Sequence, residues 1–152
     1  WLVLEVTESA VMKNPDLALY ILYVLNGMGI TLSIDDYGTG YSSMSYLKKL
    51  PVQEIKIDKS FVLNLASNKE DEIIVRSTIS LGHNLGLKVT AEGVEDEISY
   101  KMLKDFGCDL AQGFLFSKAL TVDELNIFIK SSPYGLSDNN IASTKGPKEK
   151  KT

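Results

Sequence analysis

The stretch Leu32-Ser-Ile-Asp-Asp-Tyr-Gly-Thr-Gly-Tyr41 joins an apolar run to two adjacent carboxylates, Asp35 and Asp36. Apolar residues alternate before the pair, which predicts a strand, and a glycine-rich turn at 38–40 follows it. Carboxylates that lie close together repel each other, so a fold that gathers them usually holds a cation or a shared proton nearby. The stretch therefore predicts a cation site where a strand ends.

Strand and helix signals alternate along the rest of the chain. Further strands are expected at 2–7, 52–58, 88–91 and 108–111, and helices at 14–28, 42–50, 70–85, 98–106 and from 121 onward. Asn14 before Pro15 is typical of a helix start. Capping boxes are expected at Ser67–Glu70 and at Thr121–Glu124. Repeated strand–helix units at this spacing predict a parallel sheet, either doubly wound or closed into a barrel.

Polar residues at the strand ends distinguish these two folds. Five successive strands run into such residues: Glu5; Asp35 and Asp36; Lys56 and Asp58; Glu92; and Gln112. A TIM-type (β/α)8 barrel gathers its chemistry at the carboxyl ends of several strands, whereas a doubly wound sheet concentrates it at one switch point, often with a phosphate loop. No such loop motif is present. The sequence predicts a barrel, and because five units are too few for its usual ~250 residues, the chain is expected to be the C-terminal half.

Composition excludes several classes of function. The net charge of −4 gives no basic footprint, so no DNA or RNA polymer is expected as a partner. A single cysteine, Cys108, excludes an internal disulfide and fits a reducing, cytoplasmic compartment. No apolar run approaches the ~20 residues of a membrane span, although a preceding region could tether the parent protein. Residues 1–130 are expected to form the barrel part and 131–152 a polar, disordered tail.

The candidate ligands are all hard oxygen donors. Glu5, Asp35, Asp36 and Glu92 stand without histidine or cysteine, a set that suits Mg²⁺ or Mn²⁺ rather than zinc. Adjacent aspartates can flank two ions ~3.5–4 Å apart, the arrangement used for in-line displacement at phosphorus. Lys56 could neutralise a phosphate oxygen or orient a metal-bound water. The residues therefore support metal-assisted hydrolysis of a phosphoester.

Five segments, in order, resemble the successive motifs of the EAL-domain family over about residues 1–130. They are Glu5-Val-Thr-Glu-Ser9, Asp35-Asp-Tyr-Gly-Thr-Gly-Tyr-Ser-Ser43, Lys56-Ile-Asp58, Ala91-Glu-Gly-Val-Glu95 and Gln112-Gly-Phe114. The family consists of bacterial phosphodiesterases that hydrolyse cyclic di-GMP to the linear dinucleotide. The resemblance implies that substrate, a pair of Mg²⁺ or Mn²⁺ ions, a homodimer, and further sensory or cyclase domains.

The resemblance also implies roles for single residues. Glu5 resembles a metal ligand, Asp35 the residue that bridges two metals, and Asp36 a ligand of the second. Lys56 is similar to the lysine near the attacking water, and Glu92 to the general base or a second-metal ligand. Supporting or substrate-binding roles are implied for seven others: Asp58 and Gln112 at the mouth, Gly38, Thr39 and Gly40 in the loop coupled to dimerisation, Glu8 as its anchor, and Glu95.

Three features depart from the family pattern, and alternatives remain open. The Glu-Ala-Leu signature and an asparagine ligand are absent, so the 152-residue chain alone is expected to be inactive, and Ala119 stands where proline is usual. The aspartate pair could instead be capping carboxylates in a turn, and Lys56 and Asp58 could form a structural ion pair. The alternative function is a catalytically silent module that binds cyclic di-GMP or a protein partner as a sensor.

Overall fold

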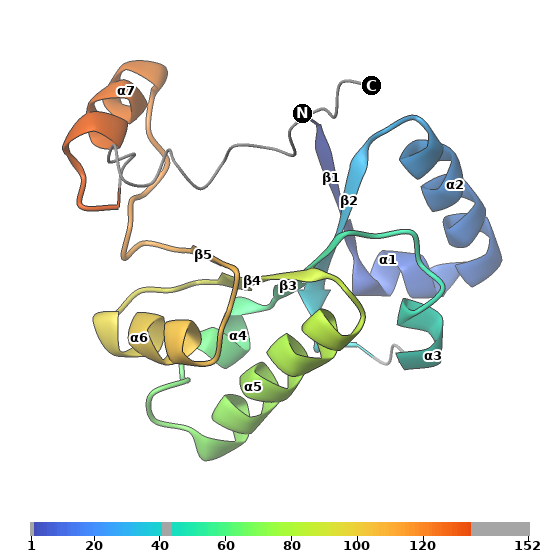
Figure 1. The fold of residues 1–152 in the computed structure, drawn as a ribbon, viewed down its shortest axis with the longest axis horizontal. Helices are drawn as coiled ribbons and strands as arrows, with labels where there is room; N and C mark the ends of the chain where they lie inside the picture. Colours follow the sequence, from blue (N-terminus) through green and yellow to red (C-terminus); the bar gives the residue numbers. More distant parts are fainter. Residues whose placement is uncertain (1, 41–43, 135–152) are drawn as a thin grey trace, which may run out of the picture. The chain divides into compact units, whose positions relative to one another are not determined.

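The computed structural model describes residues 2–40 and 44–134 and divides the chain into two compact units, Trp1–Leu115 and Phe116–Thr152. The first unit alternates strands and helices (Figure 1). In chain order its elements are β1 (Val3–Thr7), α1 (Glu8–Lys13), α2 (Pro15–Gly27), β2 (Thr31–Tyr37), α3 (Met44–Leu47), β3 (Glu54–Ile57), α4 (Lys59–Val62), α5 (Lys69–Asn84), β4 (Lys88–Glu92), α6 (Glu97–Asp105) and β5 (Leu110–Gln112). The second unit contains α7 (Val122–Ser131).

Within the described residues, the strands form one parallel sheet in the order β1-β2-β3-β4-β5. Each strand pairs with the strand that follows it in the chain, and the order never reverses. A doubly wound sheet reverses its order at a switch point, whereas a barrel adds strands in sequence. The order therefore agrees with the predicted barrel, and it brings the carboxyl ends of all these strands to one edge.

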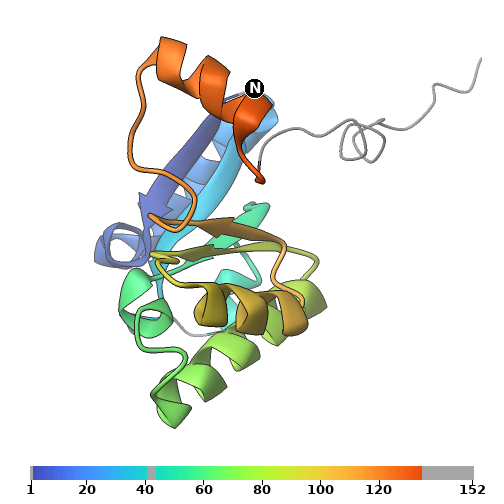
Figure 2. The ribbon, with the colours of Figure 1, turned by 90° about the vertical axis from the view of Figure 1, so that its left-hand side faces the viewer.

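Helices pack against one face of this sheet. Figures 1 and 2 show α5 and α6 on the same side of the strands. Gly82 of α5 lies directly against the sheet, because a Cβ at this position would fall 2.4 Å from Val89 Cγ2 and 3.1 Å from Ile55 Cδ1. Val89 and Ile55 are fully buried. The absence of a side chain at Gly82 therefore lets α5 approach β3 and β4 closely.

Polar residues on the other strand positions are buried too. Ser33, Lys56 and Thr90 are each no more than 5% exposed. Residues on β2, β3 and β4 are thus buried on both faces, as parallel strands usually are. The face away from the helices carries the polar side chains, so it is the face on which a site can form.

Most predicted elements are present, with corrections at their ends. Asn14 caps α2, accepting the Leu17 amide, and the Thr121 capping box opens α7 as predicted. The predicted cap at Ser67 is wrong: Asn68 caps α5, because its side chain accepts the amides of Glu70 and Asp71. Helix α3 covers only Met44–Leu47 of the predicted 42–50, whose residues 42 and 43 lie outside the described ranges. Helices α1 and α4 were not predicted.

The second unit has its own local contacts. Glu124 Oε2 accepts the Thr121 amide at 2.8 Å, and the rings of Phe116 and Tyr134 meet edge to face at 4.9 Å. Residues 135–152, most of the predicted tail, lie outside the described part of the chain. Among the described residues, no helix has the length and apolar character needed to cross a membrane.

Candidate metal centre

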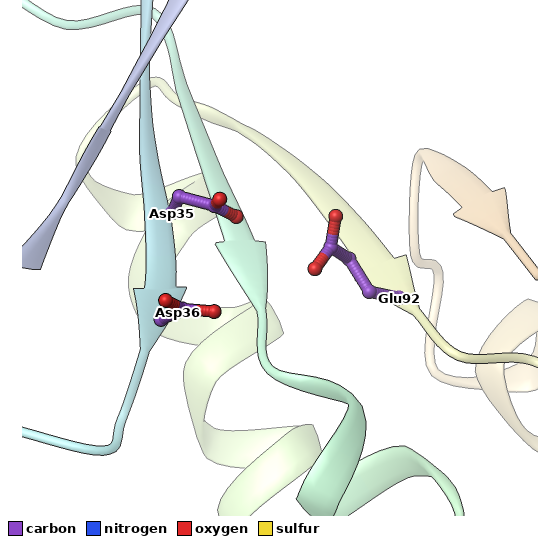
Figure 3. Close-up of side chains that lie close together, drawn as sticks. All are labelled: Asp35, Asp36 and Glu92. Atoms are coloured by element: carbon purple, nitrogen blue, oxygen red, sulfur yellow. The ribbon is translucent and has the colours of Figure 1, made fainter.

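A bulge in β2 turns both aspartates of the pair toward the same side. Ile34 pairs with Ile55, but the next pair is Tyr37 with Ile57, so β2 contains one more residue than β3 between these points. The extra residue is accommodated at Asp36, whose φ of +54° lies in the left-handed region. Neighbouring side chains in a regular strand point to opposite faces. The bulge removes that alternation, so that Asp35 and Asp36 both extend toward Glu92 (Figure 3).

These three carboxylates form a candidate cation site. One oxygen each from Asp35, Asp36 and Glu92 lies within 4.8 Å of the others. Asp35 Oδ1 is buried and has no hydrogen-bond partner among the described residues. A buried acceptor without a donor is costly, and a cation would satisfy it. The set of oxygen donors fits Mg²⁺ or Mn²⁺.

Lys56 joins three strands through its ammonium group. Its Nζ lies 2.7 Å from Glu5 Oε1, 2.6 Å from Glu92 Oε1 and 3.4 Å from Asp35 Oδ1. Burial by itself lowers the pKa of Lys56, but the hydrogen bonds that its ammonium donates to Glu5 and Glu92, together with the charges of Glu92 and Asp35, outweigh it. The pKa of Lys56 is therefore raised, and the lysine stays charged. One ammonium against these carboxylates leaves a surplus of negative charge.

Glu5 differs in detail from its expected position. It is the middle residue of β1, because the strand continues to Thr7. Its long side chain still reaches Lys56 at the shared edge. Glu5 therefore joins the cluster through the lysine, while its side chain remains 49% exposed.

Asp58 does not pair with Lys56, contrary to one alternative from the sequence. It caps α4, where its Oδ1 accepts the Ser60 amide at 3.0 Å. Burial raises the pKa of Asp58, but the hydrogen bonds from Ser60 and Lys59 outweigh it and hold the pKa below its usual range. Burial, then the charges of Asp35 and Asp58, raise the pKa of Asp36, which also shares a hydrogen bond with Asp58.

Glu8 holds the loop that follows the aspartates. It is the first residue of α1, directly after β1, and is only 3% exposed. Its Oε2 accepts the amides of Gly38 at 3.1 Å and Gly40 at 3.2 Å. The amide and hydroxyl of Thr39 both donate to Asp36 O, which closes the turn. A Cβ at Gly40 would lie 2.8 Å from the Glu8 carboxyl group, so only glycine fits there without a shift.

A cavity of about 250 Å³ opens beside Glu92. Two other predicted residues, Glu95 and Gln112, line it, together with Lys59, Gly93, Gly113 and Phe114. Gly113 lies against the backbone of Val94, which pairs with Gln112 through its amide. No role was predicted for Lys59 or Phe114, although Lys59 directly follows Asp58 and Phe114 ends the motif Gln112-Gly-Phe114.

The chain matches known proteins over most of its length. The model of the EAL domain family matches residues 1–119. The bifunctional diguanylate cyclase/cyclic di-GMP phosphodiesterase MucR of Pseudomonas aeruginosa is 48% identical over 124 residues, which cover 82% of this chain and 18% of MucR.

Solved structures share the fold. A structure of the PaMucR phosphodiesterase in complex with c-di-GMP superposes with a TM-score of 0.78 at 47% identity, covering 81% of this chain and 50% of that one. Klebsiella pneumoniae BlrP1, in a complex with manganese and cy-diGMP, gives 0.71 at 37% identity, covering 76% and 30%. The chain thus spans about half, or less, of the proteins to which it is similar. These barrel-type neighbours confirm the predicted fold class.

Proposed function

We propose a function from one premise: the chain belongs to the EAL-domain family, whose model matches residues 1–119. The complete protein is a metal-dependent phosphodiesterase that hydrolyses cyclic di-GMP to the linear dinucleotide. The observation that carries this proposal is the convergence of Asp35, Asp36 and Glu92 beside the ammonium of Lys56, with a buried oxygen on Asp35 that accepts no hydrogen bond from the described residues.

Each member of the cluster has a proposed part. Glu5, Asp35, Asp36 and Glu92 would hold the divalent metal. Divalent ions bound there would polarise the phosphate and lower the pKa of a bound water. Because the pKa of Lys56 is raised, its ammonium is available to stabilise negative charge that develops on the phosphoryl oxygens. Glu92 accepts the proton of the attacking water.

The cavity beside Glu92 supports the substrate side of the proposal. Gln112 and Glu95 offer polar groups, and Phe114, 63% exposed, offers an apolar ring. Asp58, Gly38, Thr39, Gly40 and Glu8 position the loop and the aspartates rather than the substrate. We further propose that the complete protein is a cytoplasmic homodimer with additional sensory or cyclase domains, and that residues 1–152 alone are inactive, because the Glu-Ala-Leu glutamate is not among them.

Hydrolysis of cyclic di-GMP with Mg²⁺ or Mn²⁺ tests this function. The complete protein, its Glu92→Gln variant and a Glu70→Gln control should be compared, since Glu70 is an exposed carboxylate on α5. General acid–base groups contribute about 100-fold or more, so Glu92→Gln should lose at least that much turnover while Glu70→Gln keeps it. Full activity in EDTA would refute the metal dependence. Binding of cyclic di-GMP without turnover by the wild-type protein would favour the sensor.

A further inference from the structure

The left-handed backbone at Asp36 needs contacts that hold it in place. Among the described residues, Asp36 is the only one other than glycine with a positive φ. Such a conformation costs free energy and persists only where the surroundings determine it. If it relaxed to ordinary strand geometry, the Asp36 side chain would turn away from Asp35. The convergence of the two carboxylates therefore depends on whatever fixes the loop after them.

Glu8 holds that loop through its amide groups. Its carboxylate accepts the amides of Gly38 and Gly40 and so restrains the direction of the N–H groups. Gly38 itself has φ of +103°, and glycine adopts positive φ values about as readily as negative ones. Hydrogen bonds to its amide do not prevent the Gly38 Cα from moving away from the sheet. A second contact is needed on the opposite side.

Phe61 of α4 supplies that contact. A Cβ on Gly38 would lie 3.0 Å from Phe61 Cε2 and 3.5 Å from Phe61 Cζ, so the edge of the ring occupies the space beside the Gly38 Cα. The same short helix is capped by Asp58, which directly follows Ile57, the partner of Tyr37 in the sheet. Helix α4 therefore starts beside the bulge. Phe61 has no atom that can ligate a metal, so any effect on binding is exerted through position.

We propose that Phe61 is a positioning residue for the metal centre: its ring, against Gly38, keeps the β2 bulge in the geometry that turns Asp36 toward Asp35 and Glu92. This inference rests on the proposed function, since it assumes that the cluster binds a metal. It predicts that an apolar side chain with no metal-ligating atom controls metal affinity. A role limited to packing would change stability alone.

Calorimetric titration of Mn²⁺ into the complete protein tests the assignment. Phe61→Ala should be compared with Val62→Ala, because Val62 lies in the same helix, is fully buried and also leaves a cavity when truncated. At a temperature where all variants are folded, Phe61→Ala should weaken Mn²⁺ binding by about tenfold or more, and Val62→Ala by less than about twofold. Should Phe61→Ala fail to fold, Phe61→Leu replaces it, with a smaller loss expected in the same direction.

The outcomes separate the inference from the function on which it rests. A wild-type protein that binds no Mn²⁺ refutes the proposed function. Wild-type binding with unchanged affinity in Phe61→Ala, or with an equal loss in Val62→Ala, refutes the role of Phe61 alone.

A double-mutant cycle with Gly38→Ala gives an independent readout. In the wild-type background the new methyl meets both the ring and an unfavourable φ, whereas without the ring only the φ remains unfavourable. The loss of Mn²⁺ affinity caused by Gly38→Ala should therefore be smaller in the Phe61→Ala background. Additive losses would show that the ring and the loop are not coupled.

Discussion

Carboxylates at the two ends of the same parallel sheet have opposite hydrogen-bonding environments. At the amino ends of β4 and β5, Asp109 Oδ2 accepts the Val89 amide at 2.8 Å and faces His83 Nε2 at 2.9 Å. At the carboxyl ends, Lys56 serves several carboxylates at once, and Asp35 Oδ1 has no hydrogen-bond donor among the described residues. The amino end has satisfied groups and the carboxyl end has a surplus of acceptors.

The satisfied carboxylate at the amino end and the unsatisfied cluster at the carboxyl end suit different functions. A satisfied carboxylate stabilises the fold and offers little to a ligand. An unsatisfied cluster costs stability and becomes favourable only when a cation arrives. We therefore expect substitutions at the amino end to change stability without changing activity, and substitutions at the carboxyl end to do the reverse. Lys56 is the exception, because it is the counter-charge on which the unsatisfied cluster depends.

Lys56→Met should have the largest effect of any substitution at the carboxyl end. It leaves carboxylates around a 5% exposed position without their ammonium, and breaking a buried ion pair from one side costs about 3–5 kcal/mol. The free energy of unfolding, measured with denaturant, should fall accordingly. Because Mn²⁺ can replace part of the lost positive charge, it should raise the stability of the variant more than that of the wild type. An unchanged free energy of unfolding would show that Lys56 is not the counter-charge of the cluster.

Asp35→Asn should abolish function while sparing the fold. The amide keeps the shape of the side chain, removes one negative charge from the cluster and places an N–H₂ donor beside it. Hydrolysis of cyclic di-GMP should fall by at least about 100-fold, as for other groups that act directly at the reacting atoms. The melting temperature without metal should stay the same or rise. A marked drop in that temperature would contradict the idea of surplus charge.

Asp109→Asn is the matched change at the amino end and should show the opposite pattern. Burial raises the pKa of Asp109, but hydrogen bonds from Val89 and His83 and the charges of His83 and Lys88 outweigh it, so the pKa is lowered from 3.8. A lowered carboxyl pKa stabilises the fold above its unfolded-state value, and that stability disappears as the pH falls through the folded-state pKa. The variant should lose on the order of 1 kcal/mol at neutral pH, a modest value because the side chain is 38% exposed.

Two measurements check the Asp109 prediction. Melting temperatures taken from pH 7 down to pH 3 should converge for wild type and Asp109→Asn at the acid end. Activity and Mn²⁺ affinity at neutral pH should be unchanged. A loss of affinity equal to that of a carboxyl-end variant would show that the two ends are not independent.

Asp36→Gly should have the smallest effect on stability, and a favourable one. Removing the left-handed strain at φ of +54° should raise the free energy of unfolding by about 1 kcal/mol. Part of this gain is offset because glycine increases the conformational entropy of the unfolded chain. Asp36→Asn is the control, since asparagine tolerates this conformation and lacks the charge. Asp36→Gly and Asp36→Asn should both lose metal affinity without losing stability from strain. A third variant, Asp36→Ala, should also lose stability, because alanine does not tolerate a positive φ. Equal melting temperatures for all three would contradict a strained bulge.

The sequence allowed the sheet and the ligand set to be predicted, but not the geometry that joins them. Alternating apolar residues and strand-end polar residues are local patterns, so the strands, Glu92 and the aspartate pair could be read directly. The bulge at Asp36 could not, because it is defined by a mismatch between β2 and β3 rather than by either alone. The partnership of His83 with Asp109 joins residues 26 positions apart, and neither has a motif around it. His83 could be predicted only as a residue near a helix end.

Short helices were missed for a similar reason. Helix α1 and helix α4 span six and four residues, too few to show a helical period. Asn68 rather than Ser67 caps α5, because two neighbouring residues can both serve and only the backbone of the preceding turn decides. These elements matter for function, since Glu8 and Phe61 both belong to them. The features that hold the site were thus the least visible in the sequence.

The extra residue in β2 has a consequence for anyone who transplants this centre into a designed protein. Copying the two aspartates onto a regular strand of another parallel barrel would send one carboxylate outward, whatever the surrounding residues. Only Asp35 and Asp36 lie between Ile34 and Tyr37, so the extra residue of β2 is itself one of the two ligands. A designer must therefore first reproduce the register, in which one strand has one residue more than its neighbour, and only then choose the ligands.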